Sequence, residues 1–398
     1  MKLKIAIYSG VVPSTTFIER LIIGLAESGS EVYLFGDQQR KAQYGKNIIV
    51  STYGKKFSKL WVLVRFSVLL WLFKSKEKRE LDSWISSRNR RSLLLKVKCY
   101  PVLWYAPEIF HLQWARSVED WLWVQDFGMK LVISFRGAHI NYTPITEEGV
   151  AELYLKYFPK VDGFHAVSSA IAKEAVKYGA NPEKIKVVYS GFPLTAIPSH
   201  VDMYTQEIKT IQLLSIGRSH WVKGYNYALD ACYLLKQQGI DFHYTIIGAK
   251  GVEELEYQRS ELNLIDQITF LDRVPYEEVL DKTQQAHIIL LPSVEEGIAN
   301  VVLEAMMLQK LVLTTDCGGM EEIVKDGQNG FVVPIRNPQQ MSEKIMQISE
   351  LSPSQIKEIT TQARITIETI NSEQKMVADM KSLYDFVLNP TSYESTSK

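Results

Sequence analysis

The chain alternates short apolar runs with stretches in which apolar residues recur every three or four positions. In the first half, the apolar runs that predict strands are residues 4–10, 31–36, 108–114, 130–137, 163–168 and 185–191. Periodic stretches predict a helix over 15–29, closing on Gly29, and another that contains Ile171 to Tyr178. Short apolar runs between turn residues are typical of strands buried on both faces, and their alternation with helices predicts parallel α/β layers.

From about residue 209 the same alternation starts again. The second set of predicted strands is residues 211–218, 241–248, 268–274, 287–293 and 310–316, and a turn and a short strand follow within 326–334. Between the two sets, residues 191–209 contain Pro193 and Pro198 and show no clear period. Such a segment is typical of a linker.

These patterns predict the α/β fold class with two Rossmann-like domains, one over residues 1–200 and one over 201–375. A chain of 398 residues is also longer than one ordinary core requires. We expect the domains to face each other across a deep interdomain cleft, with ligands at the carboxyl ends of the strands. For residues 376–398 we expect a helix that packs back on the first domain, and then a loose polar tail.

Residues 55–100 interrupt the alternation and form an insert that is both basic and apolar. Its basic residues are Lys55, Lys56, Lys59, Arg65, Lys74, Lys76, Lys78, Arg79, Arg88, Arg90, Arg91, Lys96 and Lys98. Residues 60–73, LWVLVRFSVLLWLF, are apolar on nearly every side of a helix but too few to cross a hydrocarbon layer of roughly 30 Å. Two interpretations stay open. The insert is either an element that dips into a membrane surface of anionic lipid, or a buried helix with a solvated basic face.

The overall composition adds little to this organisation. Hydrophobic residues make up 46% and charged residues 23%, as in an ordinary globular protein, and 45 basic residues balance 45 acidic ones. The balance gives no argument for nucleic-acid binding. The 3 cysteines are far apart and the N-terminus has no signal-peptide core, so we expect a reducing, cytoplasmic location. Peripheral contact with the inner face of the cell membrane is a further possibility that rests on the insert.

Three strand-to-helix passages in the second half carry the candidate chemistry. In the first, GRSHWVKG, glycines and the cations Arg218 and Lys223 follow a predicted strand. Glycines such as Gly217 let a backbone approach a ligand closely, and the two cations suit an anion. The alternative is that both cations are ordinary surface residues.

In the second passage, SVEEGIANVVLEAM, Asn300 is expected to cap a helix that starts at Val301. Glu296 precedes this helix, and Glu304 lies about one turn inside it. A carboxylate on an apolar helix needs a partner, either ligand hydroxyls or a structural ion pair. Glu295 has no assigned role, and we expect it to be solvated.

The third passage, LTTDCGGMEE, places Gly318 and Gly319 after a predicted strand, where they permit close backbone approach to a ligand. Taken in order, the three passages resemble the C-terminal domain of glycosyltransferase family 4. These are GT-B enzymes that retain the anomeric configuration of a nucleotide-sugar donor. The family pattern has two glutamates separated by seven residues, and Glu296 and Glu304 match it.

The resemblance implies a role for each matched position. Arg218 and Lys223 would hold the diphosphate, Glu304 the ribose hydroxyls and Glu296 the donor sugar, with Glu296, Arg218 and Lys223 as the catalytic set. The glycines Gly217, Gly318 and Gly319 would line the donor site. Backbone amides around Asn300, Val301 and Gly10 would complete a phosphate cradle. It also implies that neither a metal, a cofactor nor a protein nucleophile is needed.

The first domain most resembles bacterial enzymes of colanic-acid, exopolysaccharide and lipopolysaccharide assembly. The resemblance implies transfer of a sugar from a UDP- or GDP-sugar to a saccharide or lipid-linked acceptor. One departure concerns ISFRGAH, where Arg136 occupies a position that is commonly His and His139 follows. Arg136, His139 and His111 are therefore candidates for binding the acceptor or the sugar, and Arg136 suits an anionic group. His111, like His165, is strand-associated and is also compatible with a place in the core or the cleft.

Further departures keep other functions open. Ala299, Gln309 and Thr15 stand where related sequences often carry Pro, Gly and Glu. The alternatives are a GT-B epimerase or phosphorylase-like enzyme, and a scaffold that binds glycan or a partner transferase without catalysis. The sequence matches neither a phosphorylase lysine nor an epimerase set of acids, and the four matched side chains argue against a bare scaffold.

Overall fold

The structure, a computed structural model, describes residues 2–54, 56–88, 92–192 and 210–390. The chain divides into two compact units. Unit 1 comprises residues 1–167, 171–191 and 373–398, and unit 2 comprises 168–170 and 192–372. Most of the predicted linker, from 193 to 209, and the end of the predicted tail, from 391, lie outside the described residues.

Unit 1 is built on a wholly parallel sheet with the strand order β3-β2-β1-β4-β5-β6-β7. Its strands are β1 (Lys4–Val12), β2 (Glu31–Gln38), β3 (Ile48–Tyr53), β4 (Ile109–Leu112), β5 (Lys130–Phe135), β6 (Gly163–Ala166) and β7 (Ile185–Val187). The edge strand β3 is not predicted by the pattern, because most of its side chains are only half-buried and its apolar run is mixed with Ser and Thr.

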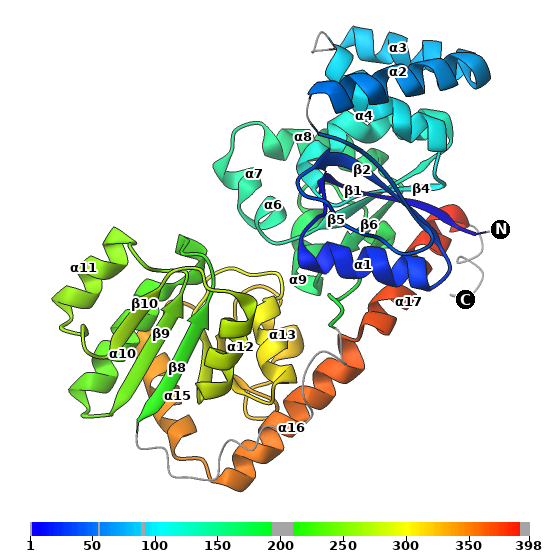
Figure 1. The fold of residues 1–398 in the computed structure, drawn as a ribbon. Helices are drawn as coiled ribbons and strands as arrows, with labels where there is room; N and C mark the ends of the chain where they lie inside the picture. Colours follow the sequence, from blue (N-terminus) through cyan, green and yellow to red (C-terminus); the bar gives the residue numbers. More distant parts are fainter. Residues whose placement is uncertain (1, 55, 89–91, 193–209, 391–398) are drawn as a thin grey trace. The chain divides into compact units, whose positions relative to one another are not determined.

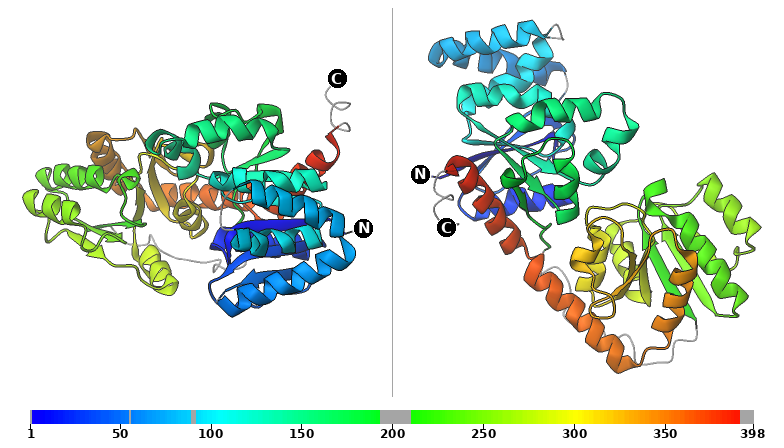
Figure 2. Two further views of the ribbon diagram at one scale, coloured as in Figure 1. Left: turned by 90° about the horizontal axis from the view of Figure 1, so that it is seen from above. Right: turned by 180° about the vertical axis from the view of Figure 1, so that it is seen from behind.

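Helices cover this sheet (Figure 1). They are α1 (Thr16–Glu27), α2 (Lys56–Phe73), α3 (Ser75–Ser87), α4 (Ser92–Tyr105), α5 (Val118–Trp121), α6 (Ala138–Asn141), α7 (Thr143–Thr146), α8 (Val150–Tyr157), α9 (Ser169–Val176) and α17 (Glu373–Leu388). Helix α17 lies against α1 and β6, so the last helix of the chain completes the core of unit 1 (Figure 2).

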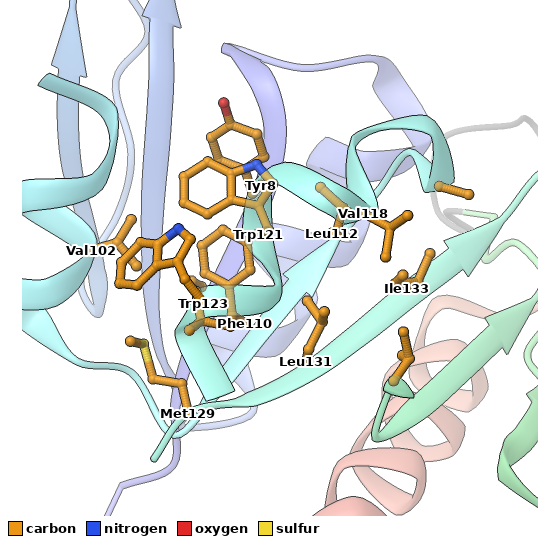
Figure 3. Packing of buried hydrophobic residues seen from close by; sticks show 14 of the residues in the cluster. Tyr8, Val102, Phe110, Leu112, Val118, Trp121, Trp123, Met129, Leu131 and Ile133 are labelled. Atoms are coloured by element: carbon orange, nitrogen blue, oxygen red, sulfur yellow. The ribbon is translucent and has the colours of Figure 1, made fainter. Parts of the chain in front are cut away.

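The core of unit 1 is rich in aromatic rings (Figure 3). Trp121 stacks on Phe110, with ring centroids 4.5 Å apart, and its ring centroid lies 4.4 Å from that of Tyr8. Trp123 is 1% exposed and lies next to them. Burial of such large rings supplies much of the driving force for folding, and these two tryptophans are therefore core residues.

The insert forms the helices α2, α3 and α4 between β3 and β4. Helix α4 lies between the sheet and the other two helices, since it contacts β2, α2 and α3 (Figure 1). Helix α2 buries Val62, Phe66 and Leu70, which share one face at a spacing of four residues. None of the described helices is long and apolar enough to cross a membrane.

Unit 2 repeats the architecture with a six-stranded parallel sheet of order β10-β9-β8-β11-β12-β13. Its strands are β8 (Ile211–Ile216), β9 (Phe242–Ile247), β10 (Ile268–Leu271), β11 (Ile288–Leu291), β12 (Leu311–Thr315) and β13 (Phe331–Val333). Its helices are α10 (Tyr225–Gln237), α11 (Glu253–Glu261), α12 (Tyr276–Gln285), α13 (Asn300–Met307), α14 (Met320–Ile323), α15 (Pro338–Ser349) and α16 (Pro353–Ile370). The strand order of both sheets confirms the prediction of two Rossmann-like domains.

Candidate functional site

The candidate residues of unit 2 gather at the point where its strand order reverses. The first strand of the unit, β8, lies in the middle of the sheet beside β11, and the chain runs outward from β8 in both directions. In open parallel sheets, ligands bind outside the carboxyl ends of the strands at this switch point. The loops that leave β8 and β11 here are residues 217–224 and 292–299.

The two loops are joined to each other. The backbone N–H of Val294 donates to the carbonyl of Val222 over 2.8 Å. Gly224 adopts a φ of +61°, and a Cβ at this position would collide with the carbonyl oxygen of Pro292. Gly224 therefore lets the first loop lie directly against the second, which fixes the position of Lys223.

Lys223 and Glu296 form an ion pair across these loops, between Nζ and Oε1. The hydroxyl of Ser293 donates to the same carboxylate oxygen over 3.1 Å. The side chains of Lys223 and Glu296 are 21% and 16% exposed, so the pair is mostly withdrawn from water but still reachable. A charged pair in this setting is strengthened by the low local dielectric and held in one geometry.

Gly318 and Gly319 pack against the loop that carries Glu296. Gly318 has a φ of +54°, and a Cβ there would collide with the carbonyl oxygen of Glu296. The N–H of Gly319 donates to the carbonyl of Gly297 over 2.9 Å. Gly318 and Gly319 thus let their own backbone lie close to the loop that carries Glu296. Their place in a donor site stays a prediction.

The helix that carries Glu304 begins one residue earlier than predicted. Asn300 is the first residue of α13, Ala299 occupies the N-cap position, and no side chain caps the helix. The prediction of Asn300 as the cap is therefore wrong. Glu304 and Val301 are half-buried on this helix. Glu295 is half-buried too, and its Oε1 would lie 3.3 Å from a Cβ on Gly318, so its solvation stays a prediction.

Arg218 differs from Lys223 in its surroundings. It follows Gly217 at the end of β8 and is exposed, and no ion pair is recorded for it with any of the described residues. Next to it a cavity of about 480 Å³ is lined by Ser219, His220, Trp221 and Tyr225 and by residues of α11. Its volume is within the range of small-ligand pockets. Gly217 contacts a residue that lines this cavity, because the Tyr225 hydroxyl donates to the Gly217 carbonyl over 3.0 Å.

The candidates of unit 1 lie at the corresponding edge of the other sheet. Gly10 is within β1, opposite Gly36 of β2. Arg136 and His139 follow β5, and both are half-buried. The guanidinium of Arg136 donates from Nη2 to Oε1 of Gln113 over 2.9 Å and stacks on the Phe17 ring at 4.4 Å. Gln113, which follows β4, is a polar residue that the sequence pattern does not single out.

His111 is in the core, where it belongs to a chain of buried hydrogen bonds. Its Nδ1 lies 2.7 Å from the Tyr384 hydroxyl and its Nε2 lies 2.8 Å from Oγ of Ser134. Ser134 Oγ lies 2.8 Å from Nδ1 of His165, whose Nε2 lies 2.9 Å from the Val188 carbonyl. His111 is 0% exposed, so it has no ring nitrogen available to a ligand. The prediction that His111 binds the acceptor or the sugar is therefore wrong.

The direction of this chain follows from its last bond. A carbonyl only accepts, so Nε2 of His165 donates to Val188, and in a neutral ring its Nδ1 then accepts from Ser134. His111 then donates from Nε2 to Ser134 and accepts from the Tyr384 hydroxyl at Nδ1. Both rings are neutral in this arrangement. Burial agrees with it: desolvation lowers the pKa of His165 to about 3 and that of His111 well below its ordinary range, and the charge of Arg136 adds to both shifts.

Within the described part of the chain, no three His, Cys, Asp or Glu side chains lie close enough together to hold a metal ion. Lys223 and Glu296 form a charged pair at the switch point of unit 2. A cation beside a carboxylate, loop amides and a half-buried helix start can bind and orient a polar, anionic ligand.

Sequence comparisons relate the chain to known proteins. Residues 205–365 match the family model described as Glycosyl transferases group 1. The chain is 27% identical over 261 residues to the putative colanic acid biosynthesis glycosyltransferase WcaL of Salmonella typhimurium, and 27% identical over 249 residues to the amylovoran biosynthesis glycosyltransferase AmsK of Erwinia amylovora. These matches cover 64% and 60% of each chain, so they span about three fifths of the length of the curated relatives. They confirm the predicted relationship to polysaccharide glycosyltransferases.

Solved structures of the same fold extend over nearly the whole chain. Anabaena HepE in complex with UDP has a TM-score of 0.68 at 17% identity, with 97% of this chain and 100% of that one covered. Sucrose-phosphate synthase from Thermosynechococcus elongatus has a TM-score of 0.72 at 15% identity, covering 98% and 100%. At this identity the likeness concerns the fold, and it confirms the predicted GT-B class.

Proposed function

We propose that this chain, whose residues 205–365 are a Glycosyl transferases group 1 domain, transfers a sugar from a nucleotide-sugar donor to a saccharide acceptor. The names of its relatives support a role in the assembly of a surface polysaccharide. The observation that carries the proposal is the Lys223–Glu296 pair on two joined loops at the switch point of unit 2. UDP bound to HepE is consistent with such a donor.

The residues of unit 2 then act on the donor as follows. Lys223 and the exposed Arg218 neutralise the charge that develops on the diphosphate as it leaves, which is electrostatic stabilisation of the transition state. Glu296 accepts hydrogen bonds from sugar hydroxyls, and its pairing with Lys223 holds both groups ready before the substrate binds. Glu304 accepts hydrogen bonds from ribose hydroxyls. The anomeric configuration is retained without a protein nucleophile or a metal.

A panel of UDP- and GDP-sugars tests this proposal. Each nucleotide-sugar is added to the protein, and both the melting temperature and the slow hydrolysis of the donor are recorded. A donor that binds raises the melting temperature, because ligand binding to the folded state stabilises it. A panel in which no compound binds or is hydrolysed would overturn the proposal. EDTA, which removes divalent metal ions, tests the proposal that no metal is needed, and it should leave the hydrolysis of the donor unchanged.

The outer face of α2 supports a second part of the proposal, contact with a membrane surface. Opposite its buried face, the helix exposes Phe57, Leu60, Trp61, Val64, Val68, Trp71 and Leu72, each 48% exposed or more. At the angular spacing of an α-helix these residues lie within about a third of its circumference. The interpretation of this helix as buried with a basic outer face is therefore wrong, because the outer face is apolar.

Cations flank this apolar stripe. Arg65 and Lys56 are exposed and lie on its two sides, and Lys76 and Arg79 are exposed on α3. An apolar face with a basic border fits a bilayer that contains anionic lipid, with the aromatic rings at the headgroup level. We propose that a lipid-linked acceptor is reached in this way.

Co-sedimentation with liposomes tests the contact. Vesicles of phosphatidylglycerol and phosphatidylcholine should bind the protein, whereas vesicles of phosphatidylcholine alone should bind it weakly. Trp61→Asp combined with Trp71→Asp should abolish binding, and Ile265→Asp, an equally exposed site in unit 2, should not. Equal binding by the two variants would overturn the contact. Loss of a dimer in the Trp variant, without any liposome binding by the wild type, would assign the face to a second copy instead.

A further inference from the structure

Among the described residues, five side chains of unit 1 hold a buried atom without a hydrogen-bond partner; Ser14 and Trp123 hold two of these atoms, and the other three lie near one another. These three are Nε of Arg136, Nε2 of Gln113 and Nδ1 of His139. Buried donors are almost always paired, because leaving one unpaired costs free energy. Such an atom in a native protein therefore needs an explanation, and several of them near one another point to a missing ligand.

Contacts between the side chains place the three atoms in one region. Arg136 donates to Gln113 over 2.9 Å and stacks on Phe17 at 4.4 Å. The Phe17 ring lies edge-on to Trp114 with centroids 6.5 Å apart, and the Trp114 ring lies 5.3 Å from that of His139. All belong to segments that follow the carboxyl ends of β1, β4 and β5, at the switch point of this sheet.

Among the described residues, no carboxylate forms an ion pair with Arg136. The hydrogen bond of its guanidinium goes to a neutral amide. The carboxylate nearest in sequence to His139 is Glu147, and it is already engaged by Arg116 at 2.5 Å. Burial lowers the pKa of the two histidines behind Arg136 and so favours their neutral forms. A partly buried guanidinium without a counter-ion is costly, and an anionic ligand removes that cost.

We propose that Arg136, Gln113 and His139 form a subsite for an oxyanion, the carboxylate or phosphate of a charged sugar substrate. The guanidinium supplies the paired donors that fit a planar carboxylate or a phosphate. Gln113 adds an amide N–H and His139 a ring nitrogen, while the faces of Phe17 and Trp114 suit the apolar face of a sugar ring. Assigning the anion to a sugar rests on the proposed function, whereas the binding of the anion does not.

Matched pairs of neutral and charged sugars test the subsite by isothermal titration calorimetry. Glucuronate is compared with glucose, glucose 6-phosphate with glucose, and UDP-glucuronate with UDP-glucose. We expect the charged member to bind roughly tenfold more tightly or better, since a hydrogen bond to a charged group is worth that ratio. A preference confined to the free sugars places the charge on the acceptor, and one confined to the UDP-sugars places it on the donor.

Variants separate this subsite from general attraction of anions. Arg136→Met should abolish the preference and leave the melting temperature at or above that of the wild type, because it removes an unbalanced charge. Arg79→Gln removes an exposed arginine of α3 and should keep the preference. A preference that survives Arg136→Met, or no preference in any pair, would overturn the proposal.

The outcome is independent of transfer activity. If the charged sugars bind better and no nucleotide-sugar is turned over, the subsite stands and the proposed transfer falls. If transfer is measured and no pair shows a preference, the transferase proposal stands and the subsite falls.

Discussion

Lys223 and Arg136 are cations that follow strands at the carboxyl-terminal edges of the two parallel sheets, and their surroundings differ. Lys223 follows the first strand of unit 2 and is paired with Glu296, which follows β11 beside it. Arg136 follows β5 of unit 1, and its hydrogen bond goes to a neutral amide. A charge that has its counter-ion is held in a fixed geometry. A charge without a counter-ion costs free energy in the folded protein, and binding of an anion lowers that cost.

The largest effect should come from breaking the paired site. Glu296→Ala removes the partner of Lys223 and the acceptor for sugar hydroxyls, and we expect transfer to fall by roughly a hundredfold or more, as for the loss of other preorganised groups. Initial rates with the donor found by the nucleotide-sugar panel measure this. Glu321→Ala, an exposed carboxylate on α14, is the control and should keep its activity. Full activity in Glu296→Ala would remove Glu296 from the mechanism.

The site around Arg136 should affect how the free energy of unfolding depends on pH. Burial first, and the charge of Arg136 second, lower the pKa of His165 from 6.5 to about 3. Between these values the unfolded chain binds a proton that the folded chain does not. The contribution of His165 is therefore complete above pH 6.5 and is lost as the pH falls toward 3, at about 1.4 kcal/mol per pH unit.

Urea midpoints measured between pH 7.5 and 4 test this slope. His165→Gln should make the curve shallower at acid pH. Arg136→Met should also make it shallower, because protonated His165 would then no longer face a second positive charge. Curves for the wild type and both variants that fall in parallel would show that His165 does not control acid stability.

A smaller difference should appear in the stability of two methionine variants. Lys223→Met leaves the half-buried Glu296 carboxylate without its ion-pair partner and should lower the free energy of unfolding by about 1–3 kcal/mol. Arg136→Met leaves no carboxylate unpaired and should not lower it. Urea unfolding at pH 7 compares the two. Equal losses would mean that Arg136 is also held by a counter-charge.

How far the sequence predicts these features depends on what each one requires. The sheets follow from apolar runs such as KLVISF and IILL, which are buried on both faces, and every predicted strand of both units is present. The pairing of Lys223 with Glu296 needs two loops 73 positions apart to meet, which only the sheet order decides. Gln113 is unremarkable in sequence, and its importance comes from the guanidinium that the fold places against it.

The exposed apolar face of α2 is a second feature that the sequence pattern alone does not predict. A helix that is apolar all round is usually buried on every side, and periodicity does not distinguish this from one apolar face in the core and another at a surface. The distinction needs the neighbours of the helix. Here α3 and α4 lie against it, and side chains of its outer face such as Phe57, Trp61 and Leu72 stay exposed.

The smallest effect tests whether the paired site of unit 2 needs a cap on α13. Asn300 is the first residue of that helix and its side chain makes no cap hydrogen bond, so Asn300→Ala should change the free energy of unfolding by less than about 0.5 kcal/mol. Ser352 is the matched control, because it accepts from the N–H of Gln355 and forms a capping box at the start of α16. Ser352→Ala should cost about 1 kcal/mol. If urea unfolding gave equal losses for the two variants, Asn300 would be a cap after all, and the loop carrying Glu296 would depend on it. If Asn300→Ala does not change the free energy of unfolding, the joined loops and the Lys223–Glu296 pair fix the geometry of this site without a cap.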